Sequence, residues 1–371
     1  MRVLGTSRQR LPGTVAALAC CAAVAVFSGA CHRDSAAPTQ WAPPTTNPAL
    51  ESVNYALLGG AKVLFQRTGG PDYAPYPYLL DGSAGQTSTV VLRGPQNNLL
   101  GRVVLSPDGT RVAFVTQTAF QSTGFLSGNF KWDIYVAAVD GTGVRPVTTF
   151  DWNCTAHSLA WSPDAAAVLY LMSRGAPCSP DGGVVLYKKA TELSATQQLL
   201  AQEWSCYPNP YELCPLWVIQ EQRSLAQSVT GRVAAVTNIG IYLFYPAGQT
   251  LQTVAYFPPG NYGVDGLTWS PDGKRLAFLQ WSMAQGDMTL RVLDPLTGGV
   301  TILATMKLQS SWRVSGYSYS ACWLPNGASI VFTAQDGDAS SHLYVVPATG
   351  GSAVPITTAT GAVDENVSCG R

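Results

Sequence analysis

The chain has 371 residues, with 22 basic and 22 acidic side chains, and only 12% of its residues are charged. Such a composition excludes a disordered polyelectrolyte and lacks the basic surface that nucleic-acid binding requires. Its 36 glycines, 25 prolines and 10% aromatic residues instead indicate a globular protein with many turns.

Residues 1–30 have the features of an export signal. Three arginines within residues 1–10 precede an apolar run over 14–27. With 14 residues, that run is too short to cross a ~30 Å hydrocarbon core. We therefore predict a signal peptide rather than a permanent membrane helix.

The signal ends in Ser28-Gly29-Ala30-Cys31, which resembles the bacterial lipobox although Ser28 replaces the usual leucine. The resemblance implies lipidation of Cys31, and His32 after it favours the outer membrane over inner-membrane retention. Ordinary cleavage after Ala30 is the alternative. Either way we expect an exported protein in the periplasm or at the outer membrane.

Residues 31–50 form the next segment, which has no hydrophobic periodicity and contains four prolines. Proline fixes φ and removes a backbone donor. We therefore expect an extended tether over 31–50 that holds the folded part, 51–371, away from its anchor.

Six cysteines remain after the signal, an even number that suggests three disulfides in an exported protein. Sequence cannot choose among the 15 pairings. Pairing of neighbours gives Cys154–Cys178, Cys206–Cys214 and Cys322–Cys369 as the first hypothesis. A metal site is not expected, because no Cys-x-x-Cys or Cys/His cluster has ligand spacing.

One hairpin motif recurs along 51–371. An apolar residue, a Ser-Pro-Asp-Gly type of turn and an alternating apolar strand begin near Ser106, Ser162, Ser270 and Leu324. Weaker copies begin near Ser228 and Leu57, so the period is 42–66 residues. Each copy is the signature of a β-hairpin.

A second pair of strands follows each hairpin, as in 132–136 and 143–148 or in 342–346 and 353–357. A four-stranded antiparallel sheet cannot bury both faces alone, so the units must stack on one another. The sequence therefore predicts an all-β fold: a six-bladed β-propeller of four-stranded antiparallel blades. Trp161, Trp269 and Trp323 should pack between blades, and the repeated aspartates should cap their own turns.

The Trp-Ser-Pro-Asp-Gly-x-x-Leu/Val-Ala-Phe pattern, followed by Ile/Leu-Tyr-Val, resembles the TolB-type, or WD-like Pro-Asp, propeller repeat. The resemblance covers residues 51–371 and implies the architecture rather than an activity, since TolB, prolyl-oligopeptidase relatives and oligogalacturonate lyases share it. Two departures matter. No Gly-x-Ser-x-Gly elbow is present, and the chain has only three histidines, His32, His157 and His342, where the lyases rely on several and a metal.

Long, variable segments should gather on the rim opposite the Ser-Pro-Asp-Gly turns, and long loops on a rigid scaffold commonly bind ligands. The alternative is that their aromatic residues pack beneath their own loops. The candidate ligand- or partner-binding residues on this rim are Trp152, His157, Trp204, Tyr207, Tyr211, Tyr262, Asp265, Trp312 and Tyr317.

These features favour a non-catalytic, envelope-anchored propeller that binds or scaffolds a protein partner, with no cofactor and no catalytic residue assigned. One alternative is a hydrolase or lyase that acts on polysaccharide or peptide through the loop-rich rim. The second is a surface protein that binds carbohydrate. Membrane attachment would be through the lipid anchor, and a glycan is a further candidate ligand.

Overall fold

The computed structural model describes residues of one of the chain's two compact units, Pro43–Arg371. The described ranges are 53–68, 76–92, 100–124, 127–154, 156–174, 183–202, 224–237, 240–245, 250–256, 262–282, 285–308, 319–336, 340–358 and 361–371. Within them the only helix is the 3-10 turn η1 (Tyr55–Leu58), and the rest of the regular structure is β-strand.

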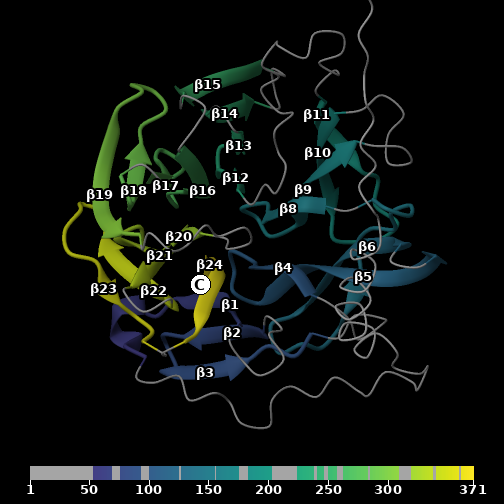
Figure 1. The fold of residues 1–371 in the computed structure, drawn as a ribbon, viewed down its shortest axis with the longest axis horizontal. Helices are drawn as coiled ribbons and strands as arrows, with labels where there is room; N and C mark the ends of the chain where they lie inside the picture. Colours follow the sequence, from purple (N-terminus) through teal and green to yellow (C-terminus); the bar gives the residue numbers. More distant parts are fainter. Residues whose placement is uncertain are drawn as a thin grey trace, which may run out of the picture. The chain divides into compact units, whose positions relative to one another are not determined.

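Four sheets have four antiparallel strands each, in an up-and-down order (Figure 1). We name each sheet by its first strand. The β4 sheet contains β4 (Leu100–Leu105), β5 (Arg111–Gly124), β6 (Ser127–Ala138) and β7 (Arg145–Pro146), and the β8 sheet contains β8 (Ala156–Trp161), β9 (Ala167–Arg174), β10 (Gly183–Ala190) and β11 (Gln198–Gln202). The β12 sheet contains β12 (Leu225–Gln227), β13 (Val233–Thr237), β14 (Gly240–Tyr245) and β15 (Thr250–Tyr256). The β16 sheet contains β16 (Tyr262–Trp269), β17 (Leu276–Ser282), β18 (Asp287–Leu293) and β19 (Val300–Lys307).

The fifth sheet has eight strands and consists of two four-stranded halves. The β20 half contains β20 (Ala321–Trp323), β21 (Ser329–Asp336), β22 (Ser340–Pro347) and β23 (Val354–Pro355). The β24 half contains β24 (Val363–Gly370), β1 (Lys62–Thr68), β2 (Tyr76–Asp81) and β3 (Gln86–Thr89). A single parallel pair, Ser341 with Val363, joins the halves, and every other strand pairing is antiparallel.

The last strand of the chain thus completes the sheet that the first strands begin. Strand β24 pairs with β1 from Lys62↔Gly370 to Thr68↔Val363, and the two lie beside each other in Figure 1. Leu57, near which the weaker copy of the hairpin begins, lies in η1 rather than beside a strand that precedes it. The pairing position next to β1 is occupied by β24 instead.

The first strands of the sheets are neighbours in space. Strand β4 contacts β8, β8 contacts β12, β12 contacts β16, β16 contacts β20, β20 contacts β24, and β24 contacts β4. Hydrophobic clusters fill the space between successive sheets. Trp161, Trp269 and Trp323 belong to three of these clusters and are 6%, 7% and 5% exposed, which confirms their predicted role in the core between sheets.

The Ser-Pro-Asp-Gly turns are fixed by their own side chains. Ser106 Oγ donates to Asp108 Oδ1 at 2.5 Å and accepts from Arg111 N at 2.9 Å, while Asp108 Oδ1 accepts from Thr110 N at 3.1 Å. The same bonds recur at the turns that begin with Ser162 and Ser270. The prediction that these aspartates cap their own turns is confirmed.

A side chain at Gly109 would clash with the end of the chain. Its φ is +68°, and a Cβ there would lie 2.0 Å from the Arg371 carbonyl oxygen, because Arg371 N bonds Pro107 O at 3.1 Å. At the matching Gly327, φ is +70° but a Cβ would meet only Pro271, at 3.8 Å.

We expect Gly109→Ala to lower the free energy of unfolding by about 2 kcal/mol, and Gly327→Ala by about 1 kcal/mol, the ordinary cost of the left-handed conformation. Urea denaturation of both variants measures the difference. Equal losses would show that the chain end does not press on Gly109.

The turn aspartates also make stability depend on pH. The hydrogen bond from Ser270 Oγ, with one from Lys274 N, holds the pKa of Asp272 below its usual 3.8. Because the folded-state pKa is depressed, this contribution is present above the unfolded pKa and is lost as pH falls through the lower folded-state value.

We therefore expect Asp272→Asn to flatten the loss of stability below about pH 4. Asparagine should keep the turn at neutral pH, as Asn326 does by accepting from Ala328 N at 2.9 Å. Urea denaturation across the acid range tests this. A variant that loses stability as steeply as the wild type would refute it.

Basic side chains link most neighbouring sheets at the turns. Lys62 Nζ donates to Gly109 O at 3.3 Å. Arg111 Nη2 donates to Ala165 O at 2.6 Å and its guanidinium lies over the Trp161 ring. Arg232 Nη2 donates to Gly273 O and lies over the Trp269 ring, and Arg275 lies 5.0 Å from the centre of the Trp323 ring. The matching positions hold Ala167 in the β8 sheet and Ser329 in the β20 half. Two junctions therefore have no such contact.

Candidate binding site

Of the predicted binding residues, the structure describes two side chains. Trp152 is 38% exposed in the turn before β8, and Asp265 is half-buried on β16. His157 and Tyr262 lie on β8 and β16, but their side chains are outside the described part. Cys31, Trp204, Tyr207, Tyr211, Trp312 and Tyr317 also lie outside the described residues. A binding role for this set stays a prediction.

Trp152 lies close to the long hairpin that β5 and β6 form. Strands β5 and β6 extend past their sheet, and Phe120 and Phe130 near the end are 54% and 42% exposed, with ring centres 5.1 Å apart. Asn153 Oδ1 accepts from Phe130 N at 3.1 Å, and Asn153 N donates to Phe130 O at 2.6 Å. These bonds hold the Trp152 turn against the hairpin.

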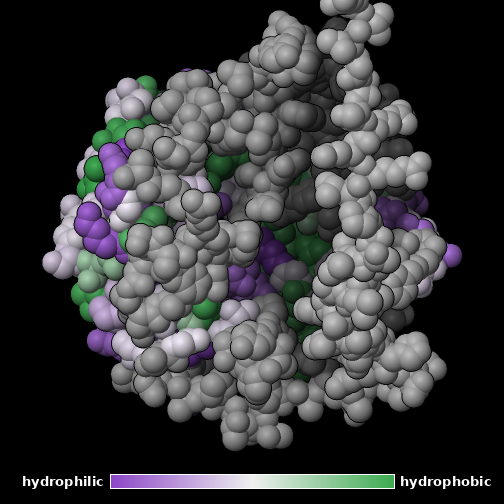
Figure 2. Space-filling model, in the orientation of Figure 1, coloured by the Kyte–Doolittle hydropathy of each residue, from purple (hydrophilic) through white to green (hydrophobic). Residues whose placement is uncertain are grey.

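A cavity of about 270 Å³ lies where the first strands converge; we call it the axial cavity. Its walls contain residues from all six of these strands. Its lining includes Arg102, Val104, Leu105, Leu159, Ala160, Trp161, Leu225, Ala226, Gln227, Leu267, Thr268, Trp269, Ala321, Cys322, Trp323, Val367, Ser368, Cys369 and Arg371. Both hydrophilic and hydrophobic residues are visible in a hollow near the middle of Figure 2.

The turns border the same cavity. Pro107, Pro163, Pro271 and Pro325, one from each of four turn copies, line it together with Val229 of the weaker copy, which is 57% exposed. The border is thus largely apolar. Sequence reasoning missed this site because it assigned the turns a structural role and looked for function on the opposite rim. The signal available was the repeat itself, since equivalent positions of stacked units must face one axis.

Trp323 Nε1 and Gln227 Oε1 are buried atoms of cavity-lining residues that have no hydrogen-bond partner among the described residues. In the other copies the indole is satisfied, since Trp161 Nε1 donates to Val104 O at 3.1 Å and Trp269 Nε1 donates to Ala226 O at 3.3 Å.

A buried donor or acceptor without a partner costs about 1–3 kcal/mol, so such groups normally meet water or a ligand. Both atoms belong to residues that line the cavity but have almost no accessible surface themselves, so an occupant would bond them only after neighbouring side chains shift. The charged side chains among its described lining residues are Arg102 and Arg371, both basic. An occupant with peptide groups, or with negative charge, would match this wall.

The described residues hold no group of three or more His, Cys, Asp or Glu side chains placed to bind a metal ion. Within the same ranges, no helix is long and apolar enough to span a membrane.

Comparison with known proteins relates the fold to solved structures. No family model and no curated protein matches the sequence. The structure is similar to TolB from Acinetobacter baumannii, with a TM-score of 0.58 and 16% identity over 83% of this chain and 66% of that one. The chain has a TolB-like β-propeller fold. It spans about two thirds of the length of that TolB chain.

Two further solved structures are similar to this one. A chain of a nidogen/laminin complex matches with a TM-score of 0.54 and 10% identity over 84% of this chain and 99% of that one. An oligogalacturonate lyase in complex with manganese matches with a TM-score of 0.50 and 15% identity over 80% and 74%. At such low identities these similarities extend to the fold alone.

Proposed function

We propose that the chain is a non-catalytic propeller of the cell envelope whose axial cavity receives a peptide segment of a protein partner. The observation that carries this proposal is the pair of unsatisfied buried groups, Trp323 Nε1 and Gln227 Oε1, in a wall bordered by proline and Val229. A peptide unit offers the complementary carbonyl and amide, and its side chains would contact the apolar border. The nidogen/laminin and TolB similarities are in keeping with this function.

The proposal includes six blades arranged in a closed ring. The cycle of contacts from β4 through β24 and back to β4 supports it, as does the pairing of β24 with β1, which joins the two ends of the folded unit. We further propose that residues 1–30 direct export, that Cys31 carries the lipid anchor, and that 31–50 act as the tether. The outer membrane or periplasm would then be the place of binding.

Trp323→Phe should separate binding from stability. Phenylalanine removes the Nε1 donor while keeping most of the ring, so we expect partner binding to weaken about tenfold with little change in the free energy of unfolding. The matched control is Trp269→Phe, which breaks the bond to Ala226 O and should instead lower stability by about 1 kcal/mol. Equal loss of stability in both variants would argue against a ligand role for Trp323 Nε1.

Site-specific crosslinking in intact envelopes tests which rim meets the partner. A photoreactive side chain at Val229 should give one defined adduct, which Trp323→Phe reduces. The same group at Trp152 reports on the loop-rich rim. An adduct from position 152 alone would move the site to that rim, and no adduct from either would count against a scaffolding role.

The enzyme alternative has its own test. Purified protein would be incubated with cell-wall and plant polysaccharides and with peptides, and any turnover would be compared with that of His157→Ala. Activity that this variant abolishes would replace the binding proposal.

A further inference from the structure

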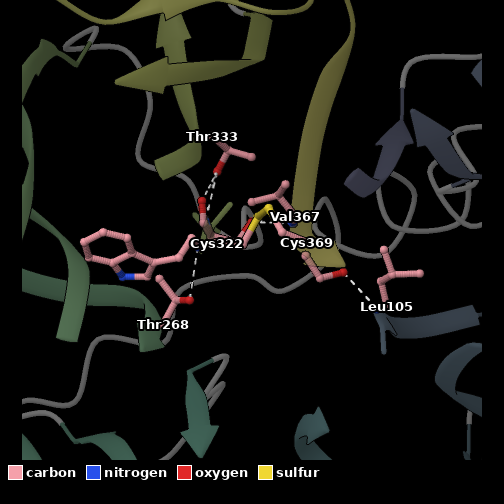
Figure 3. The surroundings of a disulfide bond; sticks show 9 residues. Leu105, Thr268, Cys322, Thr333, Val367 and Cys369 are labelled. Carbon is pink, nitrogen blue, oxygen red and sulfur yellow. Dashed lines mark hydrogen bonds between the residues drawn. A yellow bond between two sulfur atoms is a disulfide. The ribbon is translucent and has the colours of Figure 1, made fainter. Parts of the chain in front are cut away.

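The Cys322–Cys369 disulfide lies in the wall of the axial cavity and links β20 to β24 (Figure 3). Cys322 is 6% exposed and Cys369 is half-buried. Cys154 is also disulfide-bonded, but it is 1% exposed and belongs to the hydrophobic cluster between the β4 and β8 sheets. Cys322 and Cys369 line the axial cavity, whereas Cys154 is not among the residues that line it.

The linked strands meet at a junction without a basic contact between turns. Lys62, Arg111, Arg232 and Arg275 reach across four junctions, while Ser329 holds the equivalent position in the β20 half. A serine side chain is too short to span to the next turn. The disulfide thus links the ends of β20 and β24 that lie near the turns, as a basic side chain links the turns at four other junctions.

Other contacts hold β24 independently of the disulfide. It pairs with β1 along its length, and near its start Arg67 binds Asp364. Further along, Val367 N donates to Ser320 Oγ at 2.6 Å, and Ser368 Oγ accepts from Leu105 N at 2.9 Å. Cleavage of the disulfide would therefore loosen the β20–β24 junction beside the cavity without releasing β24 from its sheet.

We propose that Cys322–Cys369 is a thiol–disulfide exchange site, opened by a dithiol that approaches through the axial cavity. One thiolate of the dithiol attacks Cys369 Sγ, forming a mixed disulfide and releasing Cys322 as a thiolate that takes up a proton. The second thiol of the reagent then attacks the mixed disulfide and releases Cys369. Two electrons pass to the protein, and the dithiol becomes a disulfide. This inference rests on the cavity wall and does not depend on a protein partner.

Differential alkylation of the folded full-length protein tests the proposal, with Cys154 as the internal control. Dithiothreitol is added, free thiols are trapped at intervals, and labelling of each cysteine is read by mass spectrometry. We expect Cys322 and Cys369 to be labelled together and at least about tenfold faster than Cys154, because access limits exchange. Near-ultraviolet circular dichroism should show that the protein remains folded.

The dependence of the rate on denaturant gives the second measurement. Exchange through the cavity should change little at low urea concentrations, whereas exchange through global unfolding would accelerate with the full unfolding m-value. Labelling of Cys154 as fast as Cys369, or labelling that follows global unfolding, would overturn the proposal.

Discussion

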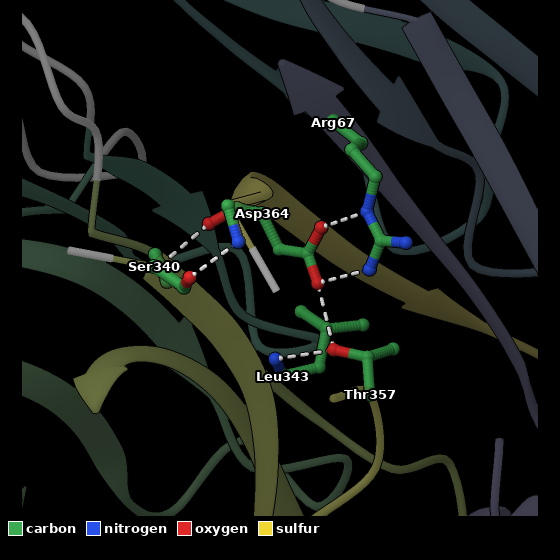
Figure 4. Close-up of polar contacts among 7 residues, drawn as sticks. Arg67, Ser340, Leu343, Thr357 and Asp364 are labelled. Carbon is green, nitrogen blue, oxygen red and sulfur yellow. Dashed lines mark hydrogen bonds and ion pairs between the residues drawn. The ribbon is translucent and has the colours of Figure 1, made fainter. Parts of the chain in front are cut away.

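Asp364→Ala should lower the free energy of unfolding by about 3–5 kcal/mol, because it leaves a buried guanidinium without its counter-charge. Arg67 Nε and Nη2 donate to the two carboxylate oxygens of Asp364 at 2.6 and 2.8 Å, and the side chains are 6% and 0% exposed (Figure 4). Thr357 Oγ1 adds a third hydrogen bond at 2.7 Å. Chemical denaturation monitored by tryptophan fluorescence would measure the loss.

Two comparisons make this prediction specific. The double variant Arg67→Met with Asp364→Leu removes both charges and should recover much of the loss, since apolar replacements of a buried pair are often tolerated. Glu192→Ala breaks the exposed pair with Arg145, whose side chains are 37% and 67% exposed, and should cost less than about 1 kcal/mol. If Asp364→Ala cost no more than Glu192→Ala, the ion pair would not be what fastens β24 to β1.

The repeat could be predicted from the sequence because its signals are local. Each Ser-Pro-Asp-Gly turn fixes its geometry with bonds inside six residues, as at Ser106 and Asp108. The alternating apolar residues that follow place one face of the strand in the core. The same local signal predicted some outer strands to be longer than they are, since 143–148 and 353–357 contain only the two-residue strands β7 and β23.

Strand β24 could not be predicted, because nothing within Val363–Gly370 repeats the motif and its partner β1 is some 300 residues away in the chain. Its burial depends on Arg67, whose role is invisible until Asp364 is placed beside it. The nearest-neighbour rule nevertheless gave the correct Cys322–Cys369 pair. Cys178, Cys206 and Cys214 lie outside the described residues, so the other two predicted pairings stay predictions.

The axial cavity could not be predicted for a different reason. Its wall differs from the rest of the repeat at one tryptophan, because Trp323 Nε1 lacks the carbonyl partner that Trp161 and Trp269 have. In sequence the three tryptophans are equivalent. Only their surroundings in three dimensions distinguish the two that complete the core from the one that leaves a donor in the cavity wall.

Removal of the disulfide by Cys322→Ser with Cys369→Ser should lower the free energy of unfolding by about 4 kcal/mol, as the chain-entropy model gives for a closed segment of 47 residues. The bond restricts the unfolded chain, and in the folded state the Arg67–Asp364 pair and the β1–β24 pairing keep the strand in place. The double variant should therefore remain folded and unfold at lower urea concentration, while reduction of the wild type should bring its midpoint close to that of the variant. A double variant as stable as the oxidised protein would show that the ends of the folded unit are held together by β-pairing and the ion pair alone.

Combining the double variant with Asp364→Ala tests whether the disulfide and the ion pair act on the same strand. If both stabilise β24, the combined loss of stability should differ from the sum of the separate losses by more than about 0.5 kcal/mol.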